Sequence, residues 1–450
     1  MLPDPYPVHP WTESCKGSVR IPGSKSLTNR ALIIAALGDS KVRLNGALFS
    51  RDTRIMSTIL QQLGFELTLN HEEEWIEING RAGDIPNGSG SFHVGNAGTA
   101  ARFLTAFVCL HPSGHFHFDG DEEMRARPMQ GLIEALQNQG ARFTFHGEEN
   151  CFPFEVATSG LRGGTWEVDA RASSQMLSAL MMVAPLAREP VTIRCPNVRP
   201  AFVDMTAGIM RQWDAIIAGS PSEGFELRGS QCYSGPRSGM FEIEPDVTAA
   251  SYFMMLPRVV GGSLKILGFR KNLLQGDSAF ASILRDIGLE IEQLADGWRV
   301  TAGPLPHDRH RVYDFKYFSD TFLTLAAVAP LLPFKVTIAG IGHTRMQETD
   351  RIHAMANELS RVGAAVEEHE TSLIIEPFSE SSRPWQIPVT VETYKDHRVA
   401  MSFAILGCSP RYGGNSPWLR VADPACCGKT FPAFFSKLEE LYRISHDKTS

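Results

Sequence analysis

The stretch KSLTNRALIIAALGDSKVRLNGALFSRDTRIMSTILQQLGFELTLNHEEEWIEIN, residues 25–79, contains most of one structural unit of this chain. A polar opening at Lys25 and Ser26 leads into the apolar run 31–37, which predicts a helix. The run 42–44 predicts a strand, and a second amphipathic helix over 55–64 ends on a glycine, as a left-handed helix cap favours. Alternating runs at 65–69 and 75–78 predict two more strands. With a strand before the first helix, the unit reads β-α-β-α-β-β.

The polar opening recurs six times along the chain. Its copies are KS at 25–26, NAGT at 96–99, SSQ at 173–175, DVT at 246–248, SDT at 319–321 and KDHR at 395–398. One marker in each copy (Lys25, Gly98, Ser173, Val247, Ser319 and Asp396) gives intervals of 73, 75, 74, 72 and 77 residues. A fixed period of this kind indicates a repeated structural unit. We therefore expect an α/β fold of six repeats, packed as two groups of three.

The composition narrows the class of protein. The chain has 450 residues, of which 43% are hydrophobic and 21% charged, as in ordinary globular proteins. Its net charge of -7 argues against a general nucleic-acid surface. No apolar run approaches the roughly 20 residues that span a bilayer, and the N-terminus lacks the basic segment of a secretory signal. These features predict a cytoplasmic protein that contacts neither nucleic acid nor membrane.

Metal and nucleotide motifs are missing from the sequence. The eight cysteines form no C-x-x-C pair, so we expect reduced thiols rather than zinc or disulfide chemistry. The 14 histidines show no H-E-x-x-H spacing, and neither a G-x-G-x-x-G nor a Walker motif occurs. The sequence therefore predicts no metal and no nucleotide cofactor.

The six helix openings predict a site for an anionic ligand. Helix N-termini present unpaired N–H groups and the positive end of the helix dipole, so several of them directed at one place would bind anions. Taken alone, each cluster is more often an ordinary helix cap or a solvated surface. The functional interpretation is favoured over these alternatives only because the clusters occupy equivalent positions in the repeat. Together with the polar stretches 20–30, 125–128, 345–351 and 428–432, the clusters supply two carboxylates, Asp320 and Glu348, as candidate acid–base groups. They also supply six cations: Lys25, Arg30, Arg127, Arg351, Arg398 and Lys429.

Seven of these stretches resemble the EPSP synthase family of enolpyruvyl transferases. They are GSKSLTNR at 23–30, GNAGTA at 95–100, MRARP at 124–128, SSQ at 173–175, ETDR at 348–351, YKDHR at 394–398 and KTFP at 429–432. They follow the family's order over nearly the whole chain. The resemblance implies an inside-out α/β fold with two domains of three repeats each. Domain I would contain residues 1–21 and 243–450, domain II residues 22–242, and the ligands would bind in a cleft between them that closes.

The resemblance also implies the chemistry. The family transfers the enolpyruvyl group of phosphoenolpyruvate to the 5-hydroxyl of shikimate 3-phosphate and releases phosphate, a step of the shikimate pathway to aromatic amino acids. It uses no metal or organic cofactor, its members are expected to be monomers, and glyphosate inhibits it at the phosphoenolpyruvate site. By this resemblance Asp320, Glu348 and Lys25 are catalytic.

The remaining site residues are assigned by the same resemblance. Phosphoenolpyruvate would contact Lys25, Asn96, Gly98, Thr99, Arg127, Gln175, Arg351, Arg398 and Lys429. Shikimate 3-phosphate would contact Lys25, Ser26, Arg30, Ser173, Ser174, Gln175, Asp320, His343 and Gln347.

Four positions depart from the family pattern. Gln347 stands where lysine is usual, His343 replaces asparagine, Phe202 replaces tyrosine and Phe103 replaces proline. Since they lie mainly on the acceptor side, two alternatives stay open: a related enolpyruvyl transferase with another acceptor, and a catalytically silent homologue. The cell-wall enolpyruvyl transferases fit poorly, because their loop cysteine has no counterpart between Cys109 and Cys151.

Overall fold

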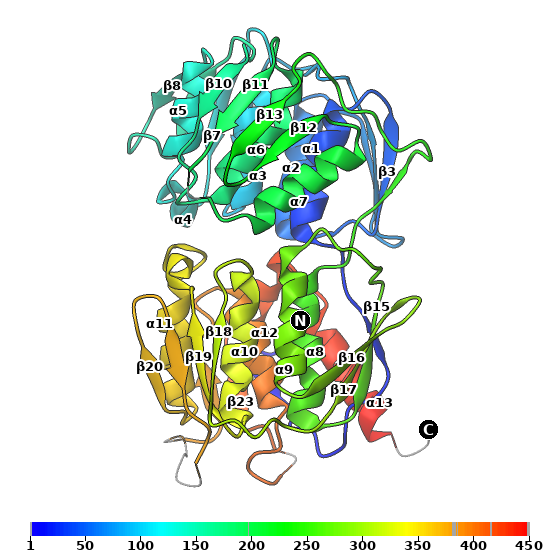
Figure 1. Cartoon of the computed structure of the whole chain (residues 1–450), viewed down its shortest axis with the longest axis vertical. Coiled ribbons are helices and arrows are strands. Elements are labelled where there is room, and N and C mark those ends of the chain that lie inside the picture. Colours follow the sequence, from blue (N-terminus) through cyan, green and yellow to red (C-terminus); the bar gives the residue numbers. More distant parts are fainter. Residues whose placement is uncertain (1, 197, 380–383, 385, 415, 448–450) are drawn as a thin grey trace. The chain divides into compact units, whose positions relative to one another are not determined.

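The computed structural model describes residues 2–196, 198–379, 384, 386–414 and 416–447 (Figure 1). Contacts divide the chain into two compact units. The continuous unit is Gly23–Glu244, and the split unit combines Met1–Pro22 with Pro245–Ser450.

The continuous unit contains three repeats of the predicted order. The first has α1 (Lys25–Leu37), β3 (Lys41–Asn45), α2 (Arg51–Gln62), β4 (Leu67–Asn70) and β5 (Trp75–Asn79). The second has β6 (Ser89–His93), α3 (Gly98–Val108), β7 (His115–Asp119), α4 (Glu122–Arg125), α5 (Gln130–Asn138), β8 (Arg142–Phe145) and β9 (Phe154–Ala157). The third has β10 (Gly164–Glu167), α6 (Ser174–Val183), β11 (Val191–Arg194), α7 (Ala201–Gln212), β12 (Ile217–Ser220) and β13 (Gly224–Leu227), and β14 (Met240–Glu242) follows it.

The split unit repeats this order. Its first repeat has α8 (Val247–Val260), β15 (Ser263–Leu267), the 3-10 turn η2 (Gly276–Ala279), α9 (Phe280–Asp286), β16 (Leu289–Gln293) and β17 (Gly297–Ala302). The second has β18 (His310–Asp314), η3 (Ser319–Thr321), α10 (Phe322–Val328), β19 (Lys335–Ala339), η5 (Gly342–Met346), α11 (Arg351–Arg361), β20 (Val366–Glu368) and β21 (Leu373–Ile375). The third has β22 (Val389–Val391), α12 (His397–Gly407), β23 (Leu419–Val421), η6 (Pro424–Lys429) and α13 (Phe434–His446), while β1 (Tyr6–Val8) and β2 (Ser18–Arg20) come from the start of the chain.

Each repeat forms its own small sheet. The strand orders are β14-β3-β5-β4, β6-β7-β9-β8 and β10-β11-β13-β12 in the continuous unit, and β16-β17-β15-β2, β18-β19-β21-β20 and β1-β23-β22 in the split unit. In the β6 sheet, for example, β6 and β7 are parallel while β7–β9 and β8–β9 are antiparallel. The predicted α/β class is thus confirmed. In the described residues five of the six repeats follow the β-α-β-α-β-β order, whereas the third repeat of the split unit ends with α13 and completes its sheet with β1.

Two repeats take their leading strand from a distant part of the chain. Strand β2 precedes α1 in sequence but pairs with β15, with Val19 opposite Ile266. Strand β14 precedes α8 but pairs with β3, with Phe241 opposite Leu44. The chain therefore leaves the split unit after β2 and returns to it after β14.

The first helix of each repeat is buried in its unit. In the split unit α8, α10 and α12 contact one another, and Figure 1 shows them side by side with sheets around them. In the continuous unit α3 contacts both α1 and α6. A helix that is buried on every side must be apolar all round. This explains the continuous run 31–37, in which every residue is buried.

Glycine and proline set the helix ends. Gly64, Gly140, Gly288 and Gly363 follow the second helices with φ between 87° and 106°, which confirms the predicted left-handed caps. The apolar stretch 176–187 is not one α-helix as expected. Pro185 removes a backbone donor, so α6 ends at Val183 and a 3-10 turn follows.

Within the part of the chain that the structure describes, no helix combines the length and the apolar character needed to cross a membrane.

Candidate functional site

In the split unit, the Asp320 carboxylate accepts hydrogen bonds from two arginines. Its Oδ1 accepts from Arg351 Nη1 at 3.0 Å, and its Oδ2 from Arg398 Nη2 at 2.8 Å. Asp320 lies inside the turn η3, whose cap makes no side-chain hydrogen bond, so it is not the plain N-cap that was its ordinary alternative. Its side chain is 15% exposed and can still reach a ligand. The two guanidinium groups favour the ionised form, which can accept a proton.

The two arginines are themselves fixed by a second carboxylate. Asp396 caps α12 through the Arg398 backbone N–H at 2.8 Å and accepts from Arg351 Nε at 2.7 Å. Asp396 is 0% and Arg351 2% exposed. Burial alone would lower the pKa of Arg351, but Asp396 and Asp320 outweigh it and raise that pKa. Both arginines therefore remain charged.

A strained loop presents Asp396. Tyr394 and Lys395 have φ values of 54° and 57°, a region that residues other than glycine rarely occupy. The Tyr394 hydroxyl donates to Glu358 Oε1 at 2.8 Å, and Glu358 is fully buried in α11. The backbone N–H of Glu392 donates to the same carboxylate at 3.1 Å. These contacts hold the loop in the conformation that brings Asp396 to Arg351.

Three further predicted residues lie in the same unit. Glu348 and Lys429 form a short ion pair. Gln347 Oε1 accepts a short hydrogen bond from Arg351 Nη1. His343 Nε2 lies 2.8 Å from Ser319 Oγ, next to Asp320. The structure thus brings together all the site residues that the sequence predicts in this unit.

In the continuous unit, Lys25 is paired with a buried carboxylate. Ser24 caps α1 by accepting from the Leu27 N–H, so Lys25 is the first helical residue and Ser26 follows it. Lys25 Nζ lies 3.2 Å from Asp52 Oδ2, and Asp52 is 1% exposed. Asp52 was not among the predicted residues. Its position in the first turn of an amphipathic helix gave no signal beyond that of an ordinary helix start.

Gly98 lies among the polar groups of this unit. A Cβ at Gly98 would lie 2.9 Å from Arg127 Nη1, 2.8 Å from Arg102 Nη1 and 3.5 Å from Gln175 Oε1. Arg102 Nη1 donates to Gln175 Oε1 at 3.0 Å and to the Gly98 carbonyl at 3.2 Å. The N-termini of α3 and α6 and the Arg127 loop therefore meet here. Asn96 and Thr99 belong to the same turn, Asn96 just before α3 and Thr99 within it.

The serines at 173 and 174 open helix α6. Ser173 caps it by accepting from the Gln175 N–H at 3.3 Å, and Ser174 is the first helical residue. Ser174 is buried and Ser173 half-buried.

Arg30 is buried among neutral groups. It is 1% exposed, and its guanidinium donates to Thr206 Oγ1 at 2.7 Å, to Ser178 Oγ at 3.2 Å and to the carbonyls of Ser26 and Phe202. None of its hydrogen-bond partners within the described ranges is a carboxylate. Burial lowers the pKa of Arg30 to about 9, so the side chain keeps its charge at neutral pH.

Two of the four departures from the family pattern meet at Arg30. The guanidinium carbon lies 5.2 Å from the centre of the Phe103 ring and 5.9 Å from that of the Phe202 ring. Aromatic faces within about 6 Å stabilise a cation. The structure thus places both rings around one arginine.

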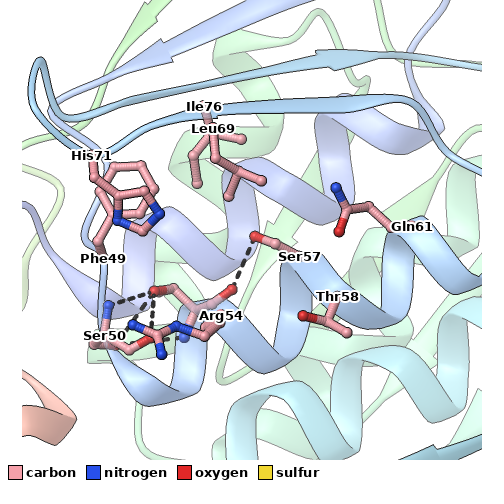
Figure 2. Close-up of a pocket in the computed structure, with 10 residues that line it drawn as sticks. Phe49, Ser50, Arg54, Ser57, Thr58, Gln61, Leu69, His71 and Ile76 are labelled. Carbon is pink, nitrogen blue, oxygen red and sulfur yellow. Dashed lines mark hydrogen bonds between the residues drawn. The ribbon is translucent and has the colours of Figure 1, made fainter.

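A separate hollow of about 210 Å³ lies in the continuous unit between α2 and the segment around β4 and β5 (Figure 2). Figure 2 shows Arg54, Ser57 and Gln61 of α2 on one side and His71 and Ile76 on the other. None of the residues predicted from the sequence lines it. Within the described ranges, no group of three or more metal-binding side chains occurs either.

Comparison with known proteins agrees with the geometry. A family model described as EPSP synthase (3-phosphoshikimate 1-carboxyvinyltransferase) matches residues 11–438. The chain is 47% identical over 450 residues to a 3-phosphoshikimate 1-carboxyvinyltransferase of Opitutus terrae, with 99% of each chain covered. It is 37% identical over 422 residues to a protein of the same name from Trichormus variabilis, covering 93% of this chain and 95% of that one.

The fold is also found in a solved structure. An EPSP synthase from Acinetobacter baumannii matches with a TM-score of 0.80 over 97% of each chain at 20% sequence identity, a likeness that concerns the fold. The family match and the 47% identical relative concern the whole chain. The chain belongs to the EPSP synthase (3-phosphoshikimate 1-carboxyvinyltransferase) family.

Proposed function

We propose that this enzyme transfers the enolpyruvyl group of phosphoenolpyruvate to the 5-hydroxyl of shikimate 3-phosphate and releases phosphate, using the residues described above. The observation that carries the proposal is the pairing of Asp320 with Arg351 and Arg398. It places a carboxylate able to accept a proton directly beside two cations able to bind an anionic donor. Relatives that share up to 47% of the sequence bear the name of this activity.

The donor's phosphate and carboxylate need several cations. Arg351, Arg398 and Lys429 of the split unit, with Lys25 and Arg127 of the continuous unit, are the proposed set. Arginine binds carboxylate and phosphate through two parallel hydrogen bonds, which fixes their orientation. Asn96, Gly98 and Thr99 around the start of α3 complete the set in the continuous unit, together with Gln175 in the first turn of α6. We propose that the side chains of the split unit and those of the continuous unit bind the donor together.

The reaction needs three proton transfers. Asp320 accepts the proton of the attacking 5-hydroxyl, so that the oxygen can add to the donor's C2 carbon. Glu348, with Lys25, delivers a proton to the methylene carbon and later removes one when phosphate leaves. Glu348 is suited to this exchange because the ion pair with Lys429 holds its carboxylate in place and partly neutralises its negative charge. No step of this scheme requires a metal ion or an organic cofactor.

The acceptor would bind mainly to the continuous unit. Ser173, Ser174 and Gln175 offer hydroxyl, amide and N–H donors to its phosphate. Arg30 with Ser26 would meet its carboxylate, which would give the buried guanidinium an anionic partner. His343 and Gln347 of the split unit would contact its hydroxyls.

The experiment is phosphate release from phosphoenolpyruvate with and without shikimate 3-phosphate. We expect release only when both are present. Asp320→Asn and Glu348→Gln should each lower turnover roughly 10²–10⁴-fold, the usual range for a positioned proton-transfer group. Asp296→Asn is the matched control, because Asp296 is an exposed residue of a hairpin turn in the same unit. Near-normal turnover in Asp320→Asn would leave Asp320 only an ion-pair partner.

A different acceptor is the second candidate, and Gln347 is the observation that favours it. Its side-chain oxygen accepts from Arg351, so it supplies the donor site with an acceptor group where the family usually has a cation. If wild type shows no turnover with shikimate 3-phosphate and Gln347→Lys adds none, this second candidate is correct. If wild type turns over, His343→Ala should lower the rate, because the His343 imidazole, which lies 2.8 Å from Ser319 Oγ next to Asp320, would supply the hydrogen-bond donor that a lysine at position 347 would otherwise offer to the acceptor.

We further propose that the enzyme acts as a monomer in the cytoplasm. Its eight cysteines are all free thiols, six of them buried, as a reducing compartment favours. Gel filtration combined with light scattering tests the oligomeric state.

A further inference from the structure

Asp277 is a buried carboxylic acid that the proposed mechanism does not use. It lies in η2 and is 6% exposed, and its Oδ1 has no hydrogen-bond partner within the described ranges. Burying an ionised carboxylate without a partner is strongly unfavourable, so such groups tend to take up a proton instead. The position of Asp277 therefore favours its neutral form.

Hydrogen bonds between the Gln275 side chain and nearby backbone groups hold the turn η2, which contains Asp277, in place. Gln275 Nε2 donates to the Pro245 carbonyl at 2.7 Å, and Gln275 Oε1 accepts from the Val247 N–H at 3.0 Å. These two bonds fasten η2 to the start of α8, and η2 also contacts η3, which carries Asp320.

The charged groups around Asp277 come from three elements. Asp320 of η3, Asp246 at the start of α8 and Arg398 of α12 interact with it electrostatically. Burial and the charge of Asp320 raise the pKa of Asp277 from 3.8 to about 7, with Arg398 opposing and Asp246 reinforcing the shift. Tyr252 of α8 also faces Arg398, but burial raises its pKa, so the phenol stays neutral.

The charges of this centre do not balance when every group is ionised. Four carboxylates (Asp246, Asp277, Asp320 and Asp396) interact electrostatically with one or both of two guanidinium groups, those of Arg351 and Arg398. An anion that binds to the arginines adds more negative charge. It therefore makes the ionised form of Asp277 still less favourable.

We propose that Asp277 is a positioning residue of the donor site, which takes up one proton from solvent when the donor anion binds to Arg398. The inference rests on the proposed function. With Asp277 neutral, Arg398 keeps its positive charge for the donor. With Asp277 ionised, part of that charge is already neutralised and the donor binds less tightly.

The sign of the pH effect follows from this linkage. Below about pH 6 the free enzyme already carries the proton, so donor binding is independent of this group. Above about pH 7 the proton is lost from the free enzyme and must be recovered on binding. The KM for phosphoenolpyruvate then rises by up to about tenfold per pH unit, until the pKa of the complex is reached. Asp277→Asn cannot titrate and lacks this rise.

The test compares the KM for phosphoenolpyruvate of wild type and Asp277→Asn at pH 6 and pH 8, with shikimate 3-phosphate saturating. The donor's own titration is common to both proteins and cancels in the ratio of the two KM values. We expect the ratio of wild type to variant to be about tenfold larger at pH 8 than at pH 6. Asp296→Asn, the exposed control, should give the same ratio at both values. A ratio for Asp277→Asn that does not change with pH overturns the inference.

A second measurement needs neither turnover nor a folded variant. The infrared difference spectrum of wild type between pH 6 and pH 8.5 should show the carbonyl band of a protonated carboxylic acid that disappears near pH 7. Absence of this band overturns the inference even if Asp277→Asn fails to fold. If wild type releases no phosphate with both substrates, the proposed function fails while the spectrum still decides the state of Asp277. Normal turnover together with a pH-independent ratio of the two KM values contradicts the role of Asp277 and leaves the proposed function intact.

Discussion

Gly98 shows how much of the site depends on one missing side chain. The tips of Arg102 and Arg127 occupy the space where a Cβ would lie, at 2.8 and 2.9 Å. Both are ends of flexible side chains, so a methyl group there would move them rather than break the fold. What would change is the direction of two guanidinium groups, one of which is a proposed donor ligand.

We therefore expect Gly98→Ala to raise the KM for phosphoenolpyruvate at least about tenfold, since a hydrogen bond to a charged group contributes about 1.5–3 kcal/mol. The melting temperature should change little. Gly147→Ala is the control, because Gly147 is exposed, has no positive φ and has only ordinary contacts around its missing Cβ. An unchanged KM in Gly98→Ala would mean that Arg127 does not bind the donor.

Most of the site residues were predictable individually, but their partners were not. The sequence indicated Lys25, Asp320, Glu348 and Arg351 from the phase of the repeat and from the family motifs. Asp52 and Asp277 escaped notice because a lone acidic residue at a helix start is ordinary in sequence. Their role depends on burial and on the charges that surround them. Neither of these can be derived from local spacing.

Among the helices and strands, the glycine that follows each second helix is the clearest link between sequence and geometry. Gly363 ends α11 with a φ of 87°. This helix carries Arg351 at its other end and Glu358 in its middle. A side chain at a left-handed position crowds the following carbonyl, and asparagine tolerates this better than other residues.

Gly363→Ala should therefore lower the free energy of unfolding by roughly 1 kcal/mol. Gly363→Asn should lower it less, and Gly363→Val should lower it more. Thermal unfolding of the three variants measures this order. Equal losses in all three would contradict a conformational cause and point to a clash instead.

The local sequence pattern could not predict which strands pair with one another. The alternating runs at 65–69 and 75–78 located β4 and β5 to within two residues, because a strand with one buried face has a period of two. The pairing of β2 with β15 joins Val19 to Ile266, and that of β14 with β3 joins Phe241 to Leu44, so the paired residues are 247 and 197 positions apart. The same alternation would fit a partner in the adjacent repeat, so only the resemblance to a known family suggested that the chain crosses twice.

The two units of the molecule differ in how the chain builds them. Every strand of the continuous unit, including β14, lies within Gly23–Glu244. The split unit depends on both ends of the chain, because β2 pairs with β15 and β1 pairs with β23. Without the first 22 residues, β15 and β23 would each lose a neighbouring strand and expose an unpaired edge.

We expect a fragment of residues 23–244 to fold alone and to unfold cooperatively in urea. A fragment of residues 245–450 should be largely unfolded or aggregated, and a peptide of residues 1–22 added in trans should restore its structure. Circular dichroism and urea titration of the fragments measure this. Cooperative unfolding of 245–450 without the peptide would show that β1 and β2 are dispensable.

The pairing of β1 with β23 also has a consequence for synthesis on the ribosome. Val421, the partner of Tyr6, is synthesised 415 residues after it. The continuous unit has all its strands once Glu244 has emerged, so it can fold while the remainder is still being translated. At about 5–20 residues per second β1 waits roughly 20–80 s for β23. During this time β1 must stay soluble without its partner strand, so the order of folding in the cell follows from the sequence distance between paired strands.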